Sequence, residues 1–243
     1  KEYRFLVLEK TRKIKGVTSP INLPGCIDVH AYRLKVYLDG VPALGYKTLI
    51  VSPMPEETAD CQAHYGAASC GMEDGCIRMV NEFLEVLIFG DGKVDVFCKE
   101  TGRRYHDILY IEDMGDCGDA YVFGEIPNGD IYTSRDSVPE ISCLIKHPLE
   151  TAYRMVYHLQ LPYSFCRETG KRSEGRADNR IEIVISLKKG SRWLDVSFDI
   201  DNTSRDHRLR ALVSTEIKTD YTWASTPFDV IKRDRREILK GSN

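Results

Sequence analysis

Stretches in which apolar and polar residues alternate recur along this 243-residue chain, and turn residues separate them. The clearest lie at residues 153–161, 181–187 and 194–200. A period of two is typical of half-buried strands, whereas no part of the sequence shows the period of a long amphipathic helix. Strand signals at intervals of roughly 8–15 residues therefore predict an all-β fold, a large antiparallel β-sandwich.

The other expected elements follow from the same pattern. Residues 81–89 should pair with 93–98, because the Gly90-Asp91-Gly92 turn between them favours a hairpin. Residues 52–74 have neither period and predict a connecting loop, and the basic, polar residues 166–180 predict a solvated hairpin tip. Further strands are expected at residues 31–38, 42–51, 105–111, 141–145 and 209–217.

The expected organisation is a small N-terminal β unit followed by the main sandwich. We place the small unit and its connecting loop at residues 1–75, and the sandwich at residues 76–243, truncated at its C-terminal end. The chain begins at Lys1 without an initiator Met or a signal peptide, and it stops soon after Arg235-Arg236. We therefore interpret it as a piece of a longer protein.

Composition and charge exclude several classes of protein. Hydrophobic residues make up 42% and charged residues 29%, which is ordinary for a soluble globular protein. The formal charge of −3 gives no electrostatic reason to expect nucleic acid or an anionic membrane as a partner. No apolar run approaches the ~20 residues that a spanning helix needs.

The eight cysteines do not form a metal-binding pattern. They lack a Cys-x-x-Cys pair and a His at ligand spacing, so a structural zinc site is not expected. Cys98 and Cys143 fall in strand-like apolar runs, where a thiol behaves as a small hydrophobe. We expect reduced thiols in a cytoplasmic protein, while a disulfide among Cys61, Cys70 and Cys76 stays open.

The most unusual segment is residues 111–123, which combines four carboxylates with two glycines between short apolar runs. Asp and Gly are depleted in strands and favoured in turns, so the segment predicts an exposed, tightly folded acidic loop that presents Tyr121. Loops of this kind often carry function. A solvated acidic turn, a calcium loop, or a Tyr121 ring buried in a following strand are the alternatives.

A family resemblance enters through this loop. Asp116-x-Gly-Asp119-x-Tyr121, preceded by Glu112-Asp113, resembles the β-domain that follows the barrel in glycoside hydrolase family 38, the retaining α-mannosidases. Other segments resemble the family in the same order, from about residue 41 to 236, and residues 1–40 carry no recognisable marker. These segments are residues 41–48, 81–86, 91–92, 99–103, 206–210 and 228–233.

The resemblance implies a mutarotase-like supersandwich that serves a retaining, zinc-dependent α-mannosidase. It implies that the catalytic carboxylates and the zinc ligands lie in an N-terminal α/β-barrel, so no catalytic residue and no metal ligand is expected in this chain. By motif position, Tyr121, Asp119 and Arg233 would close the sugar pocket, with Arg235 as an alternative to Arg233. The implied partners are this barrel and a mannoside substrate, and a homo-oligomer stays open.

Three other candidates have structural explanations as well. Arg208 and Arg210 could clamp a carboxylate or a sugar hydroxyl beside His207, but an exposed strand surface or an internal ion pair with the Asp-rich turn before it is favoured. Trp193 could stack on a sugar, or pack between sheets. A retaining glycosidase needs two carboxylates about 5 Å apart, and the acidic loop is not expected to supply them.

Two other functions stay open at this point. One is a free-standing carbohydrate-binding β-sandwich, and the other is a mutarotase-type epimerase with its own His and carboxylate in one cleft. A barrel encoded upstream of Lys1 would favour the mannosidase.

Overall fold

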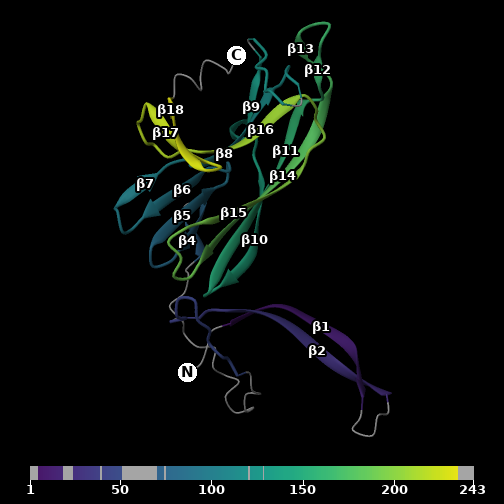
Figure 1. The fold of residues 1–243 in the computed structure, drawn as a ribbon, viewed down its shortest axis with the longest axis vertical. Coiled ribbons are helices and arrows are strands. Elements are labelled where there is room, and N and C mark those ends of the chain that lie inside the picture. The colour runs from purple at the N-terminus through teal and green to yellow at the C-terminus, as the bar shows by residue number, and fades with distance from the viewer. Residues whose placement is uncertain are drawn as a thin grey trace.

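The protein is described by a computed structural model that covers residues 5–18, 24–38, 40–50, 70–73, 75–119, 121–127 and 129–234. Within these ranges the chain is almost entirely β-structure, with one 3₁₀ turn, η2 (Ser134–Asp136) (Figure 1). The strands are β1 (Phe5–Thr18), β2 (Pro24–Val36), β3 (Cys70–Glu73), β4 (Cys76–Val80), β5 (Leu84–Phe89), β6 (Val94–Cys98), β7 (Arg103–Tyr105), β8 (Leu109–Gly115), β9 (Ile131–Thr133), β10 (Glu140–His147), β11 (Glu150–Pro162), β12 (Phe165–Cys166), β13 (Lys171–Arg172), β14 (Arg176–Lys188), β15 (Asp195–Asp201), β16 (His207–Val213), β17 (Tyr221–Thr226) and β18 (Asp229–Asp234).

The all-β fold class is confirmed, and its sheets are antiparallel throughout the described strand pairs. The largest sheets have the strand orders β3-β4-β5-β6-β7 and β10-β11-β14-β15, and a third has the order β16-β8-β9. The central pair β11–β14 runs in unbroken register from Glu150 opposite Lys188 to Pro162 opposite Arg176. Pro162 ends β11 because proline has no N–H to donate to the ladder.

One hydrophobic core joins these three sheets. Alternate residues of β5, β8, β11 and β14 point into it, as the period of two predicts. The core residues are Met79, Leu84, Val86, Ile88, Val94, Leu109, Ile111, Tyr153, Met155, Tyr157, Leu159, Leu161, Ile181, Ile183, Ile185 and Leu187. Burying these apolar side chains is the main stabilising contribution to the sandwich.

The side chain of Asn81 also joins two sheets. Its amide nitrogen donates to the carbonyls of Lys188 and Ser191, both at 2.8 Å, at the end of β14. Its amide oxygen accepts from the backbone N–H groups of Phe83 and Leu84, at 2.9 and 2.7 Å. The predicted hairpin at residues 81–98 is confirmed, but its first strand begins only at Leu84, because Asn81 caps the turn before it.

Three sequence predictions about the N-terminal part are wrong in detail. The strand expected at 31–38 is the longer β2, which pairs with β1, and its Tyr32 and Leu34 remain exposed. Residues 40–50 form no strand, since no described strand lies beside them and β-propensity needs a neighbour. The loop expected at 52–74 contains β3, which pairs with β4, and residues 51–69 and 74 lie outside the described part.

The predicted solvated tip at residues 166–180 is also wrong for part of its length. It begins as the short hairpin β12–β13, but β14 starts at Arg176, and the side chain of Asn179 is buried. Within the described ranges, no helix has the length and apolar character needed to cross a bilayer. The division of the chain near residue 75 stays a prediction.

The β1–β2 hairpin extends away from the sheets (Figure 1). An ion pair from Lys35 of β2 to Glu150 of β11 ties it to the sandwich. The Glu150 side chain is buried and also accepts a hydrogen bond from the Ser186 hydroxyl at 2.6 Å. A buried carboxylate is tolerated only when such partners compensate the loss of water.

We predict that Lys35→Ala destabilises the protein by roughly 1–3 kcal/mol, because it leaves the buried Glu150 carboxylate without its cation. Denaturant unfolding measures this change in the free energy of unfolding. Lys15→Ala, an exposed position on the same hairpin, serves as the control and should change stability by less than about 0.5 kcal/mol. Equal effects of the two variants would contradict the prediction.

Candidate functional site

The acidic segment divides into a strand and a loop. β8 continues through Glu112 and Asp113 to Gly115, with Asp113 on the buried face beside Ile111. The expectation of one exposed loop over residues 111–123 is therefore wrong for its first five residues. β16 and β9 pair with β8 on either side and satisfy its backbone, which overrides the low strand propensity of Asp and Gly.

Asp113 is the centre of a buried ion cluster. One carboxylate oxygen accepts from Arg172 Nη1 and the other contacts His207 Nδ1, each at 2.5 Å. The side chains of Asp113, Arg172 and His207 are 0%, 6% and 4% exposed. The second His207 nitrogen lies 3.0 Å from the Asn202 amide oxygen. The cluster holds β8, β13 and β16 together, so the His207 side chain contacts an internal carboxylate and is buried.

Gly115 makes room for this cluster. A Cβ atom at this position would lie 2.5 Å from Ile126 Cδ1 and 2.8 Å from Arg172 Cδ. Any larger side chain would displace the arginine that compensates Asp113. The glycine at the end of β8 is thus required for close packing and not for an unusual backbone angle.

The acidic loop is residues 116–124, and Asp116 closes its two ends. Asp116 Oδ1 accepts from the N–H groups of Gly118 and Gly124, at 2.8 and 2.9 Å. The Cys117 N–H donates to the Gly124 carbonyl at 2.8 Å, and the Asp116 N–H donates to the Asp206 carbonyl at 2.9 Å. The last bond joins the loop to the residue before β16.

Asp119 forms the turn that presents Tyr121. Its Oδ1 accepts from the N–H groups of Tyr121 and Val122, at 2.8 and 2.9 Å, and these bonds hold the pKa of the Asp119 carboxyl below its ordinary value. A Cβ at Gly118 would lie 2.0 Å from the Val122 carbonyl oxygen, so only glycine fits there. Tyr121 is 95% exposed, which excludes the alternative of a ring buried in a strand.

Two arginines on β16 cover the outer face of β8 beside the loop. Arg210 pairs with Glu112, and Arg208 places its Cζ 3.4 Å from the centroid of the Phe123 ring. Both guanidinium groups also contact Met114 Sδ, at 3.6 Å for Arg208 and 3.4 Å for Arg210. Burial, followed by the charge of Arg210, lowers the pKa of Arg208. Arg208 and Arg210 share one face of β16, as predicted, but on that face both side chains contact other groups of the protein.

The other predicted site residues lie elsewhere. Arg233 is on β18 opposite Thr222 and is exposed, and within the described part no hydrogen bond or ion pair connects it to the acidic loop. Arg235 lies outside the described residues. Trp193 precedes β15 and is 67% exposed, so the packing between sheets expected as its alternative is wrong.

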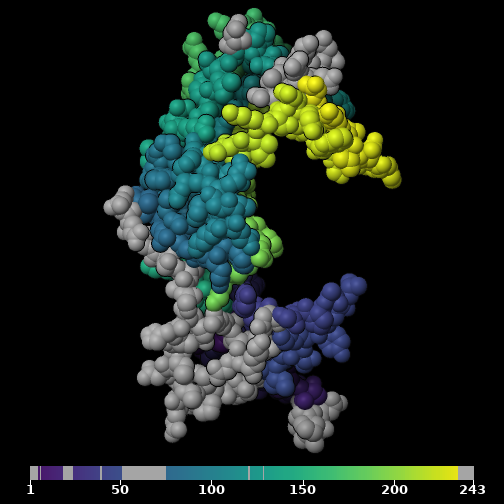
Figure 2. Space-filling model, turned by 90° about the vertical axis from the view of Figure 1, so that its left-hand side faces the viewer, coloured from purple at the N-terminus to yellow at the C-terminus, as the bar shows by residue number. Residues whose placement is uncertain are grey.

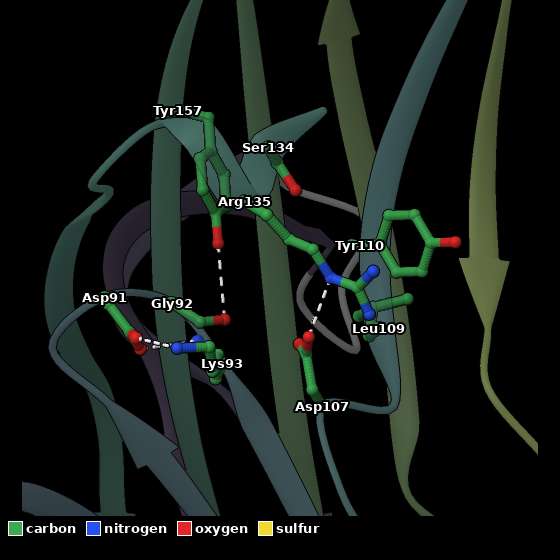
Figure 3. Close-up of a pocket in the computed structure, with 9 residues that line it drawn as sticks. All are labelled: Asp91, Gly92, Lys93, Asp107, Leu109, Tyr110, Ser134, Arg135 and Tyr157. Atoms are coloured by element: carbon green, nitrogen blue, oxygen red, sulfur yellow. Dashed lines mark hydrogen bonds and ion pairs between the residues drawn. The ribbon is translucent and has the colours of Figure 1, made fainter. Parts of the chain in front are cut away.

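A small polar pocket lies where the β5–β6 turn meets β8, η2 and β11 (Figure 3). Its charged groups already pair, Lys93 with Asp91 at 2.5 Å and Arg135 with Asp107 at 2.7 Å. Burial, with the nearby Asp107 and Asp91, raises the pKa of Tyr157 to about 12, so this phenol stays protonated near neutral pH. The pocket therefore offers neither a free charge nor an ionised nucleophile.

The described residues do not provide a zinc site. Among them, no group of three or more His, Cys, Asp or Glu side chains is arranged to hold a metal ion. Two loop carboxylates, those of Asp116 and Asp119, accept backbone N–H groups instead, so they do not have the ligand arrangement of a calcium loop. Cys26, Cys98, Cys117, Cys143 and Cys166 are not in disulfides.

The described residues thus form an all-β antiparallel fold that presents the acidic loop, and the family is identified by comparison with protein-family models. The model of the glycosyl hydrolases family 38 C-terminal domain matches residues 79–238. The chain belongs to this family.

Individual proteins similar to this chain include one sequence relative and two solved structures. The chain is 25% identical over 215 residues to a Halalkalibacterium halodurans protein named "Putative mannosylglycerate hydrolase", covering 82% of this chain and 23% of that protein. The fold of this chain resembles that of an α-mannosidase from Enterococcus faecalis V583. The TM-score is 0.71 and the identity 20%, and the match covers 95% of this chain and 27% of the other. It also resembles a family 38 protein from Enterococcus faecalis, with a TM-score of 0.68, 18% identity, and coverage of 98% and 29%. The chain thus spans about a quarter of the length of these relatives.

We predict that Asp113→Asn lowers the free energy of unfolding by about 3 kcal/mol, because it leaves Arg172 and His207 buried without a carboxylate. Thermal or denaturant unfolding measures the loss. Asp199→Asn makes the same chemical change on an exposed position of β15 and should be nearly neutral. A neutral result for Asp113→Asn would mean that the cluster does not stabilise β8.

Proposed function

We propose that this chain is the β-sandwich portion of a retaining, zinc-dependent α-mannosidase that hydrolyses terminal α-mannosides. In this proposal it supplies part of the wall of the sugar pocket and packs against a catalytic barrel formed by another part of the protein. The observation that carries the proposal is the position of Tyr121, which lies almost fully exposed at the turn of a tightly hydrogen-bonded loop.

The names of two similar proteins support a proposal for the substrate class. The Enterococcus faecalis V583 protein is described as an α-mannosidase, and the name of the Halalkalibacterium relative refers to mannosylglycerate. Both names concern a mannosyl group. We propose a mannosyl group as the part of the substrate that the pocket encloses.

Each of the three proposed wall residues has a distinct chemical use. The ring of Tyr121 can pack against the apolar face of a sugar, while its hydroxyl can donate or accept a hydrogen bond. Asp119 has one oxygen engaged by the loop backbone, so its other oxygen is the one proposed to accept from a sugar hydroxyl. Arg233 would donate from its exposed guanidinium on β18.

The chemical step is proposed to take place outside this chain. A retaining glycosidase needs a nucleophile and an acid/base carboxylate, and we propose that both lie in the barrel together with zinc, as the family resemblance implies. Zinc would hold hydroxyl groups of the mannose there. The proposal assigns no step of the reaction to the residues of this chain.

The surface of the chain supports the proposed barrel contact. Figure 2 shows a hollow side, with the β17–β18 hairpin (yellow) projecting above it and the N-terminal unit (purple and blue) below it. Trp223 and Phe228 of the projecting hairpin are exposed, and so are Tyr46 and Ile50 of the N-terminal unit. Such apolar residues are usual where another part of a protein packs. A homo-oligomer and a cytoplasmic location are further proposals, the latter from the cysteine pattern.

A free-standing carbohydrate-binding module is the second candidate. The exposed indole of Trp193 favours it, since an exposed aromatic ring can stack on a sugar. Under this function Trp193→Ala would abolish sugar binding by the chain, whereas the mannosidase proposal gives that role to Tyr121.

In the complete enzyme, we predict that Tyr121→Phe lowers kcat/KM for an aryl α-mannoside by about tenfold, ~1.4 kcal/mol, while the fold is kept. Steady-state kinetics and thermal unfolding measure the two effects. Tyr163→Phe, at a half-exposed tyrosine after β11, is the control and should leave kcat/KM unchanged. An unchanged kcat/KM for Tyr121→Phe would remove this residue from the pocket.

We predict that the purified 243-residue chain does not hydrolyse an aryl α-mannoside, with or without added zinc, because it lacks the proposed catalytic carboxylates. A chromogenic assay with the complete enzyme as positive control measures this. Zinc-dependent turnover that persists through repurification would contradict the proposed division between sandwich and barrel.

A further inference from the structure

Arg208 occupies an unusual environment for a charged side chain. Its guanidinium lies between the Phe123 ring, 3.4 Å from Cζ, and Met114 Sδ, 3.6 Å from Nη2. Its Nε atom is buried and has no hydrogen-bond partner in the described part of the chain. Burial also lowers its pKa. Burying a guanidinium with an unpartnered nitrogen costs free energy, so we expect its contacts to have a role. This guanidinium contacts Phe123 of the acidic loop.

The contact reaches the loop close to Tyr121. Phe123 follows Tyr121 by two residues and directly precedes Gly124, whose N–H donates to Asp116. The hydrogen bonds of Asp116 and Asp119 fold the loop internally, but they do not fasten its outer half to the sandwich. The stack of Arg208 on Phe123 does so.

We propose that Arg208 is a positioning residue, which holds Phe123 and thereby fixes Tyr121 in the orientation that the sugar pocket requires. The proposal rests on the proposed function of Tyr121. Strand pairing positions the backbone of Arg208, because β16 pairs with β8 so that Arg208 lies opposite Met114. Arg210, on the same face of β16, is paired with Glu112. Guanidinium groups stack well on aromatic rings, and the attraction grows when water is excluded.

The surroundings favour this role over the binding of an anionic ligand. The carboxylates of Glu112, Asp116 and Glu125 all lie close enough to favour the charged form of Arg208. The charge of Arg210 acts in the opposite direction, but Glu112 already pairs with Arg210. An added anion would therefore also meet repulsion from these carboxylates. The guanidinium is therefore suited to hold a ring and not to recruit a negatively charged substrate group.

Hydrogen exchange in the complete protein tests the contact directly. We expect Arg208→Gln to speed exchange of the Tyr121, Val122 and Gly124 amides by about tenfold or more, because the loop opens more often. Phe123→Leu should have the same effect, since it keeps an apolar side chain but removes the ring, and it leaves β16 untouched. Phe123→Tyr keeps the ring and should behave as the unaltered protein. Unchanged loop exchange in Phe123→Leu would overturn the proposal.

A double-mutant cycle tests the link to Tyr121. Arg208→Gln should lower kcat/KM for an aryl α-mannoside by about fivefold or more alone, but add little in a Tyr121→Phe background, because both changes act through one side chain. Full additivity of the two effects would overturn the proposal. Arg104→Gln is the matched control. The Cζ atom of Arg104 lies 5.2 Å from the centroid of the Phe97 ring, and neither residue belongs to the acidic loop. It should alter neither loop exchange nor kcat/KM.

The two measurements separate the contact from the proposed function. If Arg208→Gln and Phe123→Leu both loosen the loop while kcat/KM stays unchanged, the proposal fails. The failure then lies in the role of Tyr121 and not in the Arg208–Phe123 contact.

Discussion

The candidate site depends on the contacts of the buried Asp113 carboxylate with Arg172 and His207. This carboxylate sits on the core face of β8, where an uncompensated charge would be very costly, and Arg172 and His207 contact its two oxygens. These partners come from β13 and β16, so the cluster fixes three elements relative to one another. The loop starts at the end of β8 and is joined to Asp206, the neighbour of His207, which fixes where the loop begins.

Beyond that fixed point, the carboxylates of the loop serve folding. Asp116 and Asp119 each accept two backbone N–H groups, and Gly118 leaves room for the chain to return. Among the described residues of the loop, Tyr121 is then the large side chain that is almost fully exposed. This separation of tasks explains why the proposed pocket role falls mainly on Tyr121, and why Asp119 can contribute only its second oxygen.

Membership in glycoside hydrolase family 38 gives a physical context to the exposed surface. The β1–β2 and β17–β18 hairpins are two-stranded, and such ribbons are rarely stable without further packing. Both carry large exposed apolar residues, such as Ile14 and Trp223. The proposed contact with a catalytic barrel would cover the hollow side beside β17–β18 (Figure 2).

The sequence by itself determined the all-β fold class, the hairpin at residues 81–98, the end of β11 at Pro162 and the exposure of Tyr121 on a loop. These features depend on strand period and turn chemistry, which are local. Tertiary structure decided the rest. Residues 42–50 belong to a predicted strand but have no described neighbouring strand. Asp113 lies in a strand because β16 and β9 pair with β8, and its side-chain partners lie 59 and 94 residues away in the chain. The Arg172 side chain is buried although its sequence segment, residues 166–180, is basic and polar. Its burial depends on tertiary structure, because a charge is buried only where the fold brings its counter-charge close to it.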